Sequence, residues 1–166
     1  CGQRNTGTTV RIQPDPKYFD SAKINLSQLE HLLRSKAVLM PNVTVDLEIE
    51  GETKKSWCYQ NGMADYLNEM MVGTPVAPIF VGEKYVESAN GFAVGEGATW
   101  ALAWFEEGGG KPESDDNLIP TLDGGTHEAG LKAGVFEAIK TFADHHAILP
   151  AKVKLAQEDV CGRMTY

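Results

Sequence analysis

The chain has 166 residues, 42% hydrophobic and 23% charged, a composition typical of a soluble globular protein with one ordinary domain or two incomplete ones. Its formal net charge of −8 argues against strong nucleic-acid binding by this surface alone, because neutralising phosphates requires clustered Lys and Arg. No apolar run approaches the roughly 20 residues of a membrane span. The polar first residues do not look like a signal peptide, so we expect a cytoplasmic protein without a membrane partner.

The chain opens with a predicted strand and a predicted helix. Residues 8–13 alternate and include several β-branched side chains, which favours a strand. Apolar residues then recur at helical spacing from 24 to 39, so we expect a helix there. Either Asn25 or Ser27 could cap its N-terminus, and Pro41 ends it.

A hairpin and a short helix are expected next. Residues 43–60 contain two alternating runs around a turn at Gly51, the pattern of a β-hairpin. A short helix over 63–71 follows an Asn-Gly pair. We place a domain boundary near Gly62, where the hairpin gives way to this helix.

The second half of the chain predicts a small sheet. Residues 77–87 and 95–107 are expected to form partner strands, and the glycine run 108–110 a loop. Residues 115–120 give a weaker strand signal, since adjacent Asp residues are poor sheet formers. The final segment, 156–164, has a helical pattern.

The strongest prediction is a helix over residues 126–145. It carries a near-heptad apolar stripe accompanied by small packing residues. The stripe consists of Leu131, Val135, Ile139 and Phe142, with Ala129, Ala138 and Ala143 beside it.

Four sequence blocks carry a resemblance to one known family. They are NTGTTVRIQPDPKYFDS (5–21), WCYQNGMADYL (57–67), WALAWFEEGG (100–109) and NLIPTLDGGTHEAGL (117–131). In this order the chain resembles the ATPase subunits of bacterial type IIA DNA topoisomerases, the gyrase B family. The resemblance runs over essentially all 166 residues and implies an internal fragment of such a protein.

The resemblance implies an α+β fold in two unequal pieces. Residues 1–62 would be the C-terminal part of a GHKL ATP-binding domain, an α/β sandwich. Residues 63–166 would be the N-terminal part of a transducer domain, whose β-α-β unit has a left-handed crossover. In that domain the helix over 126–145 is expected to pack on the sheet.

The Thr6-Gly7-Thr8-Thr9 cluster is a candidate nucleotide site. By itself, such a cluster is more often a set of turn and strand residues that satisfy their own backbone. The resemblance implies that Thr8 helps to hold the adenine through a water, where aminocoumarin drugs also bind. Gly7 would permit close approach and Val10 would form an apolar wall. Gln13 departs from the family, which commonly has an aromatic residue there.

The Gly124-Gly125-Thr126-His127 motif has a structural and a functional interpretation. It could be a tight turn with positive-φ glycines and Thr126 as helix N-cap, or an anion site at a helix N-terminus. The chain lacks the GxxxxGK[ST] pattern of a phosphate loop, and the family places this motif in the transducer, so we favour the turn. The resemblance also puts Lys132 in the cavity through which the DNA duplex passes; a solvated helix face is the alternative.

No catalytic residue and no metal site are predicted in this segment. His145 and His146 are adjacent and point about 100° apart on a helix, so one metal cannot bind both. The carboxylates near the glycine run are expected to form a solvated acidic turn; these are Glu106, Glu107, Glu113, Asp115 and Asp116. In relatives, apolar or aromatic residues usually stand where Asp115 and Asp116 do. The three cysteines are expected to be reduced, with Cys58 a packing thiol; the others are Cys1 and Cys161.

The implied activity belongs to the intact protein. There, ATP with Mg2+ would dimerise two B subunits and close a gate on double-stranded DNA, which passes through a break made with the A subunit. The motifs WCYQNG, NLIPT and ILPAKVKL favour the topoisomerase IV branch, which decatenates chromosomes; gyrase B is the alternative within the family. The chain alone is predicted neither to hydrolyse ATP nor to bind it tightly. A free-standing, non-enzymatic α+β interaction module is the alternative outside the family.

Overall fold

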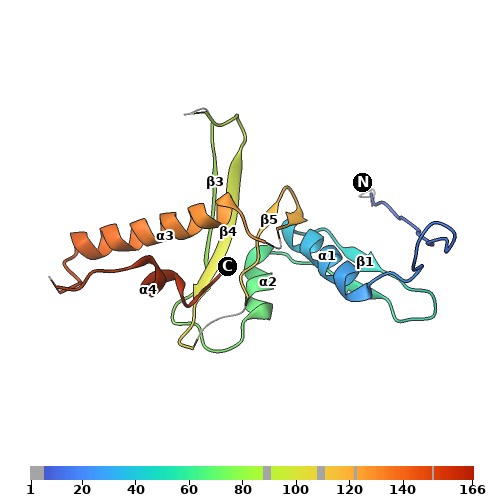
Figure 1. Cartoon of the computed structure of the whole chain (residues 1–166), viewed down its shortest axis with the longest axis horizontal. Coiled ribbons are helices and arrows are strands. Elements are labelled where there is room, and N and C mark those ends of the chain that lie inside the picture. The colour runs from blue at the N-terminus through green and yellow to red at the C-terminus, as the bar shows by residue number, and fades with distance from the viewer. Residues whose placement is uncertain (1–5, 88–90, 108–110, 122, 151) are drawn as a thin grey trace, which may run out of the picture.

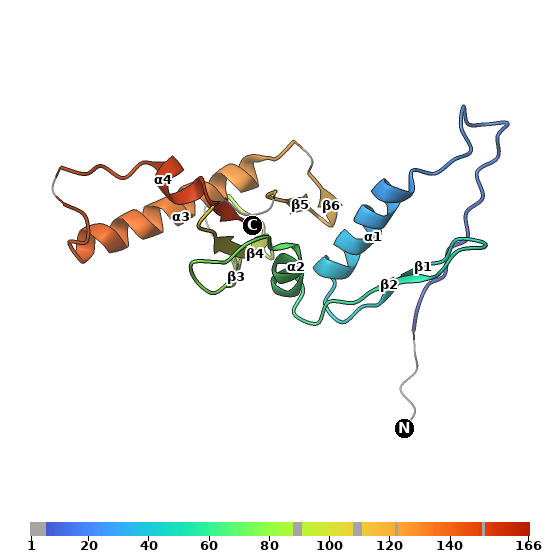
Figure 2. The ribbon, with the colours of Figure 1, turned by 90° about the horizontal axis from the view of Figure 1, so that it is seen from below.

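The computed structural model describes residues 6–87, 91–107, 111–121, 123–150 and 152–166. The molecule is elongated, as two perpendicular views show (Figures 1 and 2). Helix α1 and the first hairpin lie at one end, and helices α3 and α4 lie at the other. Helix α2 and the larger hairpin stand between them. The mixed helix-and-strand architecture expected from the sequence is confirmed.

Helix α1 spans Leu26–Leu39, slightly shorter at its start than predicted. Of the two candidate caps, the structure uses Asn25, whose side-chain oxygen accepts a hydrogen bond from the Gln28 amide at 3.2 Å. The cap satisfies one of the amides that a helix start leaves free. The helix ends at Leu39, and its C-cap Met40 stands directly before Pro41, as expected.

The predicted first hairpin is present but short. Strand β1 (Val45–Leu47) pairs antiparallel with β2 (Lys55–Trp57). Beside it, α1 and the end of the hairpin form a small core of Ala37, Val38 and Tyr59, to which Val45 and Trp57 add partly buried surface. We call this the first core.

Helix α2, Met63–Met70, connects the first core to a second one. Its Leu67 is buried with Ala101, Ala103 and Phe105, and we call this set the second core. Met63 packs against both cores. A helix shared in this way joins the two halves of the chain through apolar contact, and the domain boundary near Gly62 stays a prediction.

The second half is built on a three-stranded antiparallel sheet in the order β3-β4-β7. Its strands are β3 (Phe80–Tyr85), β4 (Gly97–Trp104) and β7 (Met164–Thr165). Gly82 lies opposite Trp100, and a Cβ at Gly82 would come within 2.5 Å of the indole, so glycine makes room for that ring. The two long strands agree with the expected pair.

The weak strand expected over 115–120 is a miniature hairpin. Strand β5 (Asp115–Asp116) pairs with β6 (Ile119–Pro120). The two loop residues between them, Asn117 and Leu118, both have positive φ, at 49° and 68°. Positive φ at both loop positions is the requirement of a type I′ turn, so a tight turn divides what the sequence pattern presented as one strand.

Helix α3 spans Thr126–His145, as predicted. The expected cap is wrong: the N-cap position is Gly125, and no side chain caps this helix. The apolar stripe is only partly correct, because Phe142 is 58% exposed. The covered face instead follows i, i+3 and i+4 spacing and is made of Glu128, Leu131, Lys132, Val135, Phe136, Ile139 and Ala143.

The last segment is a short helix followed by a strand. Helix α4 covers Gln157–Cys161, and Met164 lies in β7, where it pairs with Trp104 of β4. The prediction of one helix over 156–164 is therefore wrong at its end, since pairing with β4 prevails over the local helical pattern. Strands β4 and β7 flank α3 in sequence and pair antiparallel. A β-α-β crossover joins parallel strands, so the left-handed crossover implied by the resemblance stays a prediction.

Residues 8–13 do not form the predicted strand. They have no regular secondary structure and are exposed. A strand is stabilised by neighbours in a sheet, and no described strand pairs with this segment. The predicted loop at 108–110 lies outside the described residues. Within the described part of the chain, no helix is long and apolar enough to cross a membrane.

Candidate functional site

The predicted nucleotide-contacting residues lie on an exposed segment. Thr8, Gly7 and Val10 are all exposed, and the Val10 side chain retains 74% of its accessible surface. A Cβ added at Gly7 would have nothing within 4 Å. The structure does not bring these residues into a pocket of the described chain, and their role in adenine binding stays a prediction.

The Gly124-Gly125 turn has a specific need for its first glycine. Gly124 has φ +70°, and a Cβ there would collide with the carboxylate of Glu128. Gly125 is extended at φ −176°, a conformation open to any residue, so only one of the two glycines has the expected positive φ. His127 follows the turn, and its Nε2 lies 3.3 Å from the Thr121 hydroxyl.

Lys132 is held by two neighbours. Its ammonium lies 3.2 Å from Oε1 of Glu128, one helical turn earlier, and 5.5 Å from the centre of the Tyr166 ring. The Tyr166 hydroxyl donates to the same Glu128 oxygen. These contacts with Tyr166 and Glu128 raise the pKa of Lys132, so the ammonium stays charged. Burial, reinforced by the Glu128 hydrogen bond, raises the pKa of Tyr166 to about 12.

Glu128 and Lys132 border a shallow hollow of about 420 Å³ beside the start of α3. The hollow is lined by Asp123, Gly124, Gly125, Glu128, Ala129, Lys132 and Gln157. Its lining contains two carboxylates and one paired lysine. Such a charge balance gives little attraction for an anion, which agrees with the structural interpretation of the GGTH motif.

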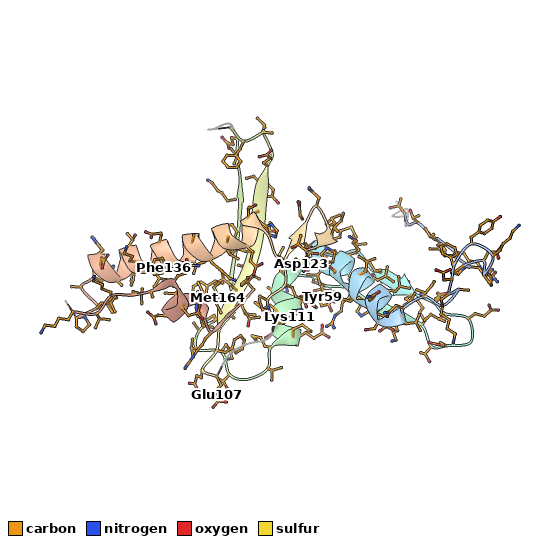
Figure 3. All side chains as sticks on the ribbon, viewed as in Figure 1. Tyr59, Glu107, Lys111, Asp123, Phe136 and Met164 are labelled. Carbon is orange, nitrogen blue, oxygen red and sulfur yellow. The ribbon has the colours of Figure 1, made fainter. Side chains whose placement is uncertain are left out.

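A second polar cluster lies where α1 meets α2, and sequence reasoning missed it. The Arg34 guanidinium donates to the Tyr59 hydroxyl at 2.7 Å and forms an ion pair of 2.7 Å with Glu69. The Tyr59 hydroxyl donates to Glu69 at 2.8 Å. The label of Tyr59 in Figure 3 marks this junction. Arg34 also lies 5.0 Å from the centre of the Tyr66 ring, a cation–π arrangement.

The cluster sets the protonation of its members. The hydrogen bond from Tyr59 and the charge of Arg34 lower the pKa of Glu69, so the carboxylate stays ionised at neutral pH. Burial and the nearby Glu113 carboxylate raise the pKa of Tyr66, whose hydroxyl donates to Glu113 at 3.0 Å. Arg34, Tyr59 and Glu69 are separated by 25 and 10 positions, so no local motif marks the cluster in sequence.

The remaining candidate groups are cysteines and histidines. Cys58 is exposed, so its predicted packing role is wrong. Cys161 is half-buried, its thiol lies 3.8 Å from the Lys132 carbonyl, and burial raises its pKa, which disfavours a nucleophilic thiolate. The rings of His145 and His146 are perpendicular to one another. Among the described residues, no group of three His, Cys, Asp or Glu side chains could hold a metal ion.

A family model and a curated relative both match this chain and point to the same family. The family model described as DNA gyrase B matches residues 62–166. The B subunit of DNA topoisomerase 4 from Salmonella typhimurium is 44% identical over the whole of this chain and 26% of its own length.

Solved structures agree at the level of fold. The topoisomerase IV ATP-binding domain of Francisella tularensis, solved with a small-molecule inhibitor, superposes with a TM-score of 0.68 at 28% identity, covering 92% of this chain and 39% of its own. The 43K ATPase domain of Thermus thermophilus gyrase B, solved with an aminocoumarin, superposes with a TM-score of 0.65 at 17% identity, covering 91% and 40%. The chain thus spans about a quarter of the length of the curated relatives that it matches.

Proposed function

The chain belongs to the DNA gyrase B family, and from this premise we propose that it is a segment of the ATPase subunit of a type IIA DNA topoisomerase of the topoisomerase IV kind. The observation that carries the proposal is the 44% identity to the B subunit of a DNA topoisomerase 4 along the entire chain. Four blocks spread over the sequence support the same family, so the proposal does not depend on one motif.

The proposed activity is ATP-driven DNA strand passage by the intact protein. ATP, with Mg2+, would bind the complete nucleotide domain and bring two copies of the protein together. The dimer would close on a DNA duplex and pass it through a break made with the A subunit of topoisomerase IV. The net acidic charge of −8 supports placing the main DNA contacts elsewhere in the complex. A cytoplasmic, nucleoid-associated location follows from that activity.

Within this scheme the two halves of the chain have different tasks. Residues 1–62 would complete the ATP-binding domain, with Thr8, Gly7 and Val10 at the adenine. Residues 63–166 would form part of the transducer, which relays the nucleotide state. The segment contains no residue that we assign to hydrolysis, so ATP turnover is a property expected only of the longer protein.

We propose a DNA-contacting role for Lys132, but its surroundings limit that role. Its ammonium is already paired with Glu128, so contact with a phosphate requires that pair to open or to be shared. A Lys132→Ala change in the full-length protein should reduce the stimulation of ATP hydrolysis by DNA. Lys140→Ala on the same helix is the matched control, since Lys140 contacts only the Phe136 ring among the described interactions. Equal stimulation in both variants would refute the role of Lys132.

A decatenation assay tests the proposed function. The full-length protein, reconstituted with the A subunit of topoisomerase IV, should unlink catenated DNA circles only when ATP is present. Introduction of negative supercoils would instead favour the gyrase alternative. A protein that neither hydrolyses ATP nor self-associates with a non-hydrolysable ATP analogue would favour the non-enzymatic interaction module.

A further inference from the structure

Residues 113–121, which we call the bridging hairpin, contact both halves of the molecule. This segment contains β5, the type I′ turn and β6, and it lies between α1 and α3 in both views (Figures 1 and 2). The sequence pattern predicts only a weak strand in this segment, and the family blocks assign it no function.

On one side, the bridging hairpin holds α1 and α2 through side chains. The Ser35 hydroxyl of α1 donates to Asp115 at 3.2 Å, and the Tyr66 hydroxyl of α2 donates to Glu113 at 3.0 Å. Ser35 precedes the buried pair Ala37 and Val38 of the first core, and Tyr66 packs against that core. The hairpin is therefore attached to the elements that enclose the first core.

On the other side, it holds the C-terminus and the start of α3. The Glu113 amide donates to the Tyr166 carbonyl at 2.9 Å, and the Tyr166 hydroxyl bonds Glu128 of α3. Thr121 bonds Ser114 across the base of the hairpin and approaches His127 of α3. A continuous set of polar contacts thus runs from α1 and α2 through the hairpin to α3.

These contacts differ in kind from the apolar connection through α2. Each is a hydrogen bond, partly buried at Ser35, Tyr66 and Tyr166 and exposed at His127, and contributes a modest net free energy because water can replace it. The apolar contacts of Met63 and Leu67 have no such replacement in water. The hydrogen bonds of the bridging hairpin can therefore open at a low free-energy cost, whereas the apolar contacts of α2 cannot. In this arrangement α2 is a hinge and the bridging hairpin is a latch beside it.

We infer that the bridging hairpin is a latch that transmits the position of α1 and α2 to α3. Asp115 has a defined part in it as the acceptor of the Ser35 hydroxyl. The functional consequence rests on the proposed function: opening of the latch would uncouple the nucleotide domain from the transducer without removing any nucleotide contact.

Hydrogen exchange tests the latch independently of any activity. In a Ser35→Ala/Tyr66→Phe double variant, the Glu113 amide should exchange about fivefold faster, because loss of about 1 kcal/mol of hydrogen bonding lowers the local opening free energy. The matched control is Ser27→Ala/Tyr18→Phe, which removes the same groups from exposed positions. Equal exchange in the two double variants would overturn the inference.

Coupling of ATP use to strand passage tests the functional consequence in the full-length protein reconstituted with its A-subunit partner. The latch variant should keep its DNA-independent ATP hydrolysis but use about fivefold more ATP per decatenation event, a factor at the lower end of allosteric couplings. An unchanged ratio would overturn transmission by the latch. Absence of ATP hydrolysis in the unaltered protein would instead contradict the proposed function, and the exchange experiment would still decide whether the hairpin is a latch.

Discussion

The two sequence blocks that carry the family resemblance most clearly differ in secondary structure and in exposure. The described part of the block around GGTH, residues 117–121 and 123–131, is folded: it contains a type I′ turn, a positive-φ glycine and the first turns of α3. The described part of the opening block, residues 6–21, is exposed and has no strand or helix. Resemblance to the family therefore does not imply regular secondary structure in this chain.

The difference follows from the range of the interactions that each block needs. The GGTH block is held by contacts with near neighbours, such as Thr121 with Ser114, and by one contact with Tyr166. A strand such as 8–13 obtains its hydrogen bonds from other strands. No strand among the described residues pairs with it, so its alternating pattern has no partner to stabilise it.

The largest expected difference in the free energy of unfolding comes from truncating one apolar side chain in the second core and one in the exposed opening block. Phe105 is 2% exposed in the second core, and Phe105→Ala should lower the free energy of unfolding by about 3–5 kcal/mol. Val10→Ala in the opening block should change it by less than about 0.5 kcal/mol, because that side chain is exposed. Urea unfolding of both variants measures the contrast, and comparable losses would show that residues 6–21 are packed in solution.

The bounds of α1, α2 and α3 were predicted well because helices form from local signals: apolar periodicity, a cap at Asn25 or Ser27, and Pro41 as terminator. The prediction failed where distant pairing decides the structure, as in residues 8–13 and at Met164, which β4 draws into the sheet. The polar cluster of Arg34, Tyr59 and Glu69 was beyond sequence reasoning for the same reason. Only the fold brings those side chains together.

Glycine substitutions sharpen the same comparison. Gly124→Ala should destabilise the chain by about 1–2 kcal/mol, since a positive φ is unfavourable for a residue with a Cβ. The new methyl group would also displace Glu128 from Lys132 and Tyr166. Gly7→Ala in the opening block is the control and should be nearly neutral, because nothing lies within 4 Å of its Cβ position. Thermal unfolding separates the two outcomes; a neutral Gly124→Ala would contradict the described turn.

The N-terminal cap of α1 can be tested by substitution. Asn25→Ala should cost about 1 kcal/mol, because it removes the side-chain acceptor of the Gln28 amide. Ser27→Ala, two residues later and exposed, should cost much less. If Ser27→Ala proved the more harmful change in circular dichroism melts, the assignment of the cap would be wrong.

The smallest effect is a pH dependence at the α1–α2 cluster. The pKa of Glu69 lies below its ordinary value of 4.5, so its contribution to stability is present above that pH and is lost as the pH falls through the folded-state pKa. The side chain is 56% exposed, and solvent screening limits the effect to about 0.5 kcal/mol or less. Glu69→Gln should make the acid limb of stability against pH less steep as the pH falls below the ordinary pKa of 4.5. An unchanged slope would show that the ion pair with Arg34 is absent in solution.

Hydrogen exchange of residues 6–13 tests most directly whether this chain is part of a nucleotide-driven protein. In the 166-residue chain these amides should exchange rapidly, as expected for an exposed segment without a sheet partner. In the full-length protein, a non-hydrolysable ATP analogue should protect them, because Thr8 and its neighbours would then lie at the adenine. Rapid exchange of these amides in the full-length protein at saturating analogue would contradict the account.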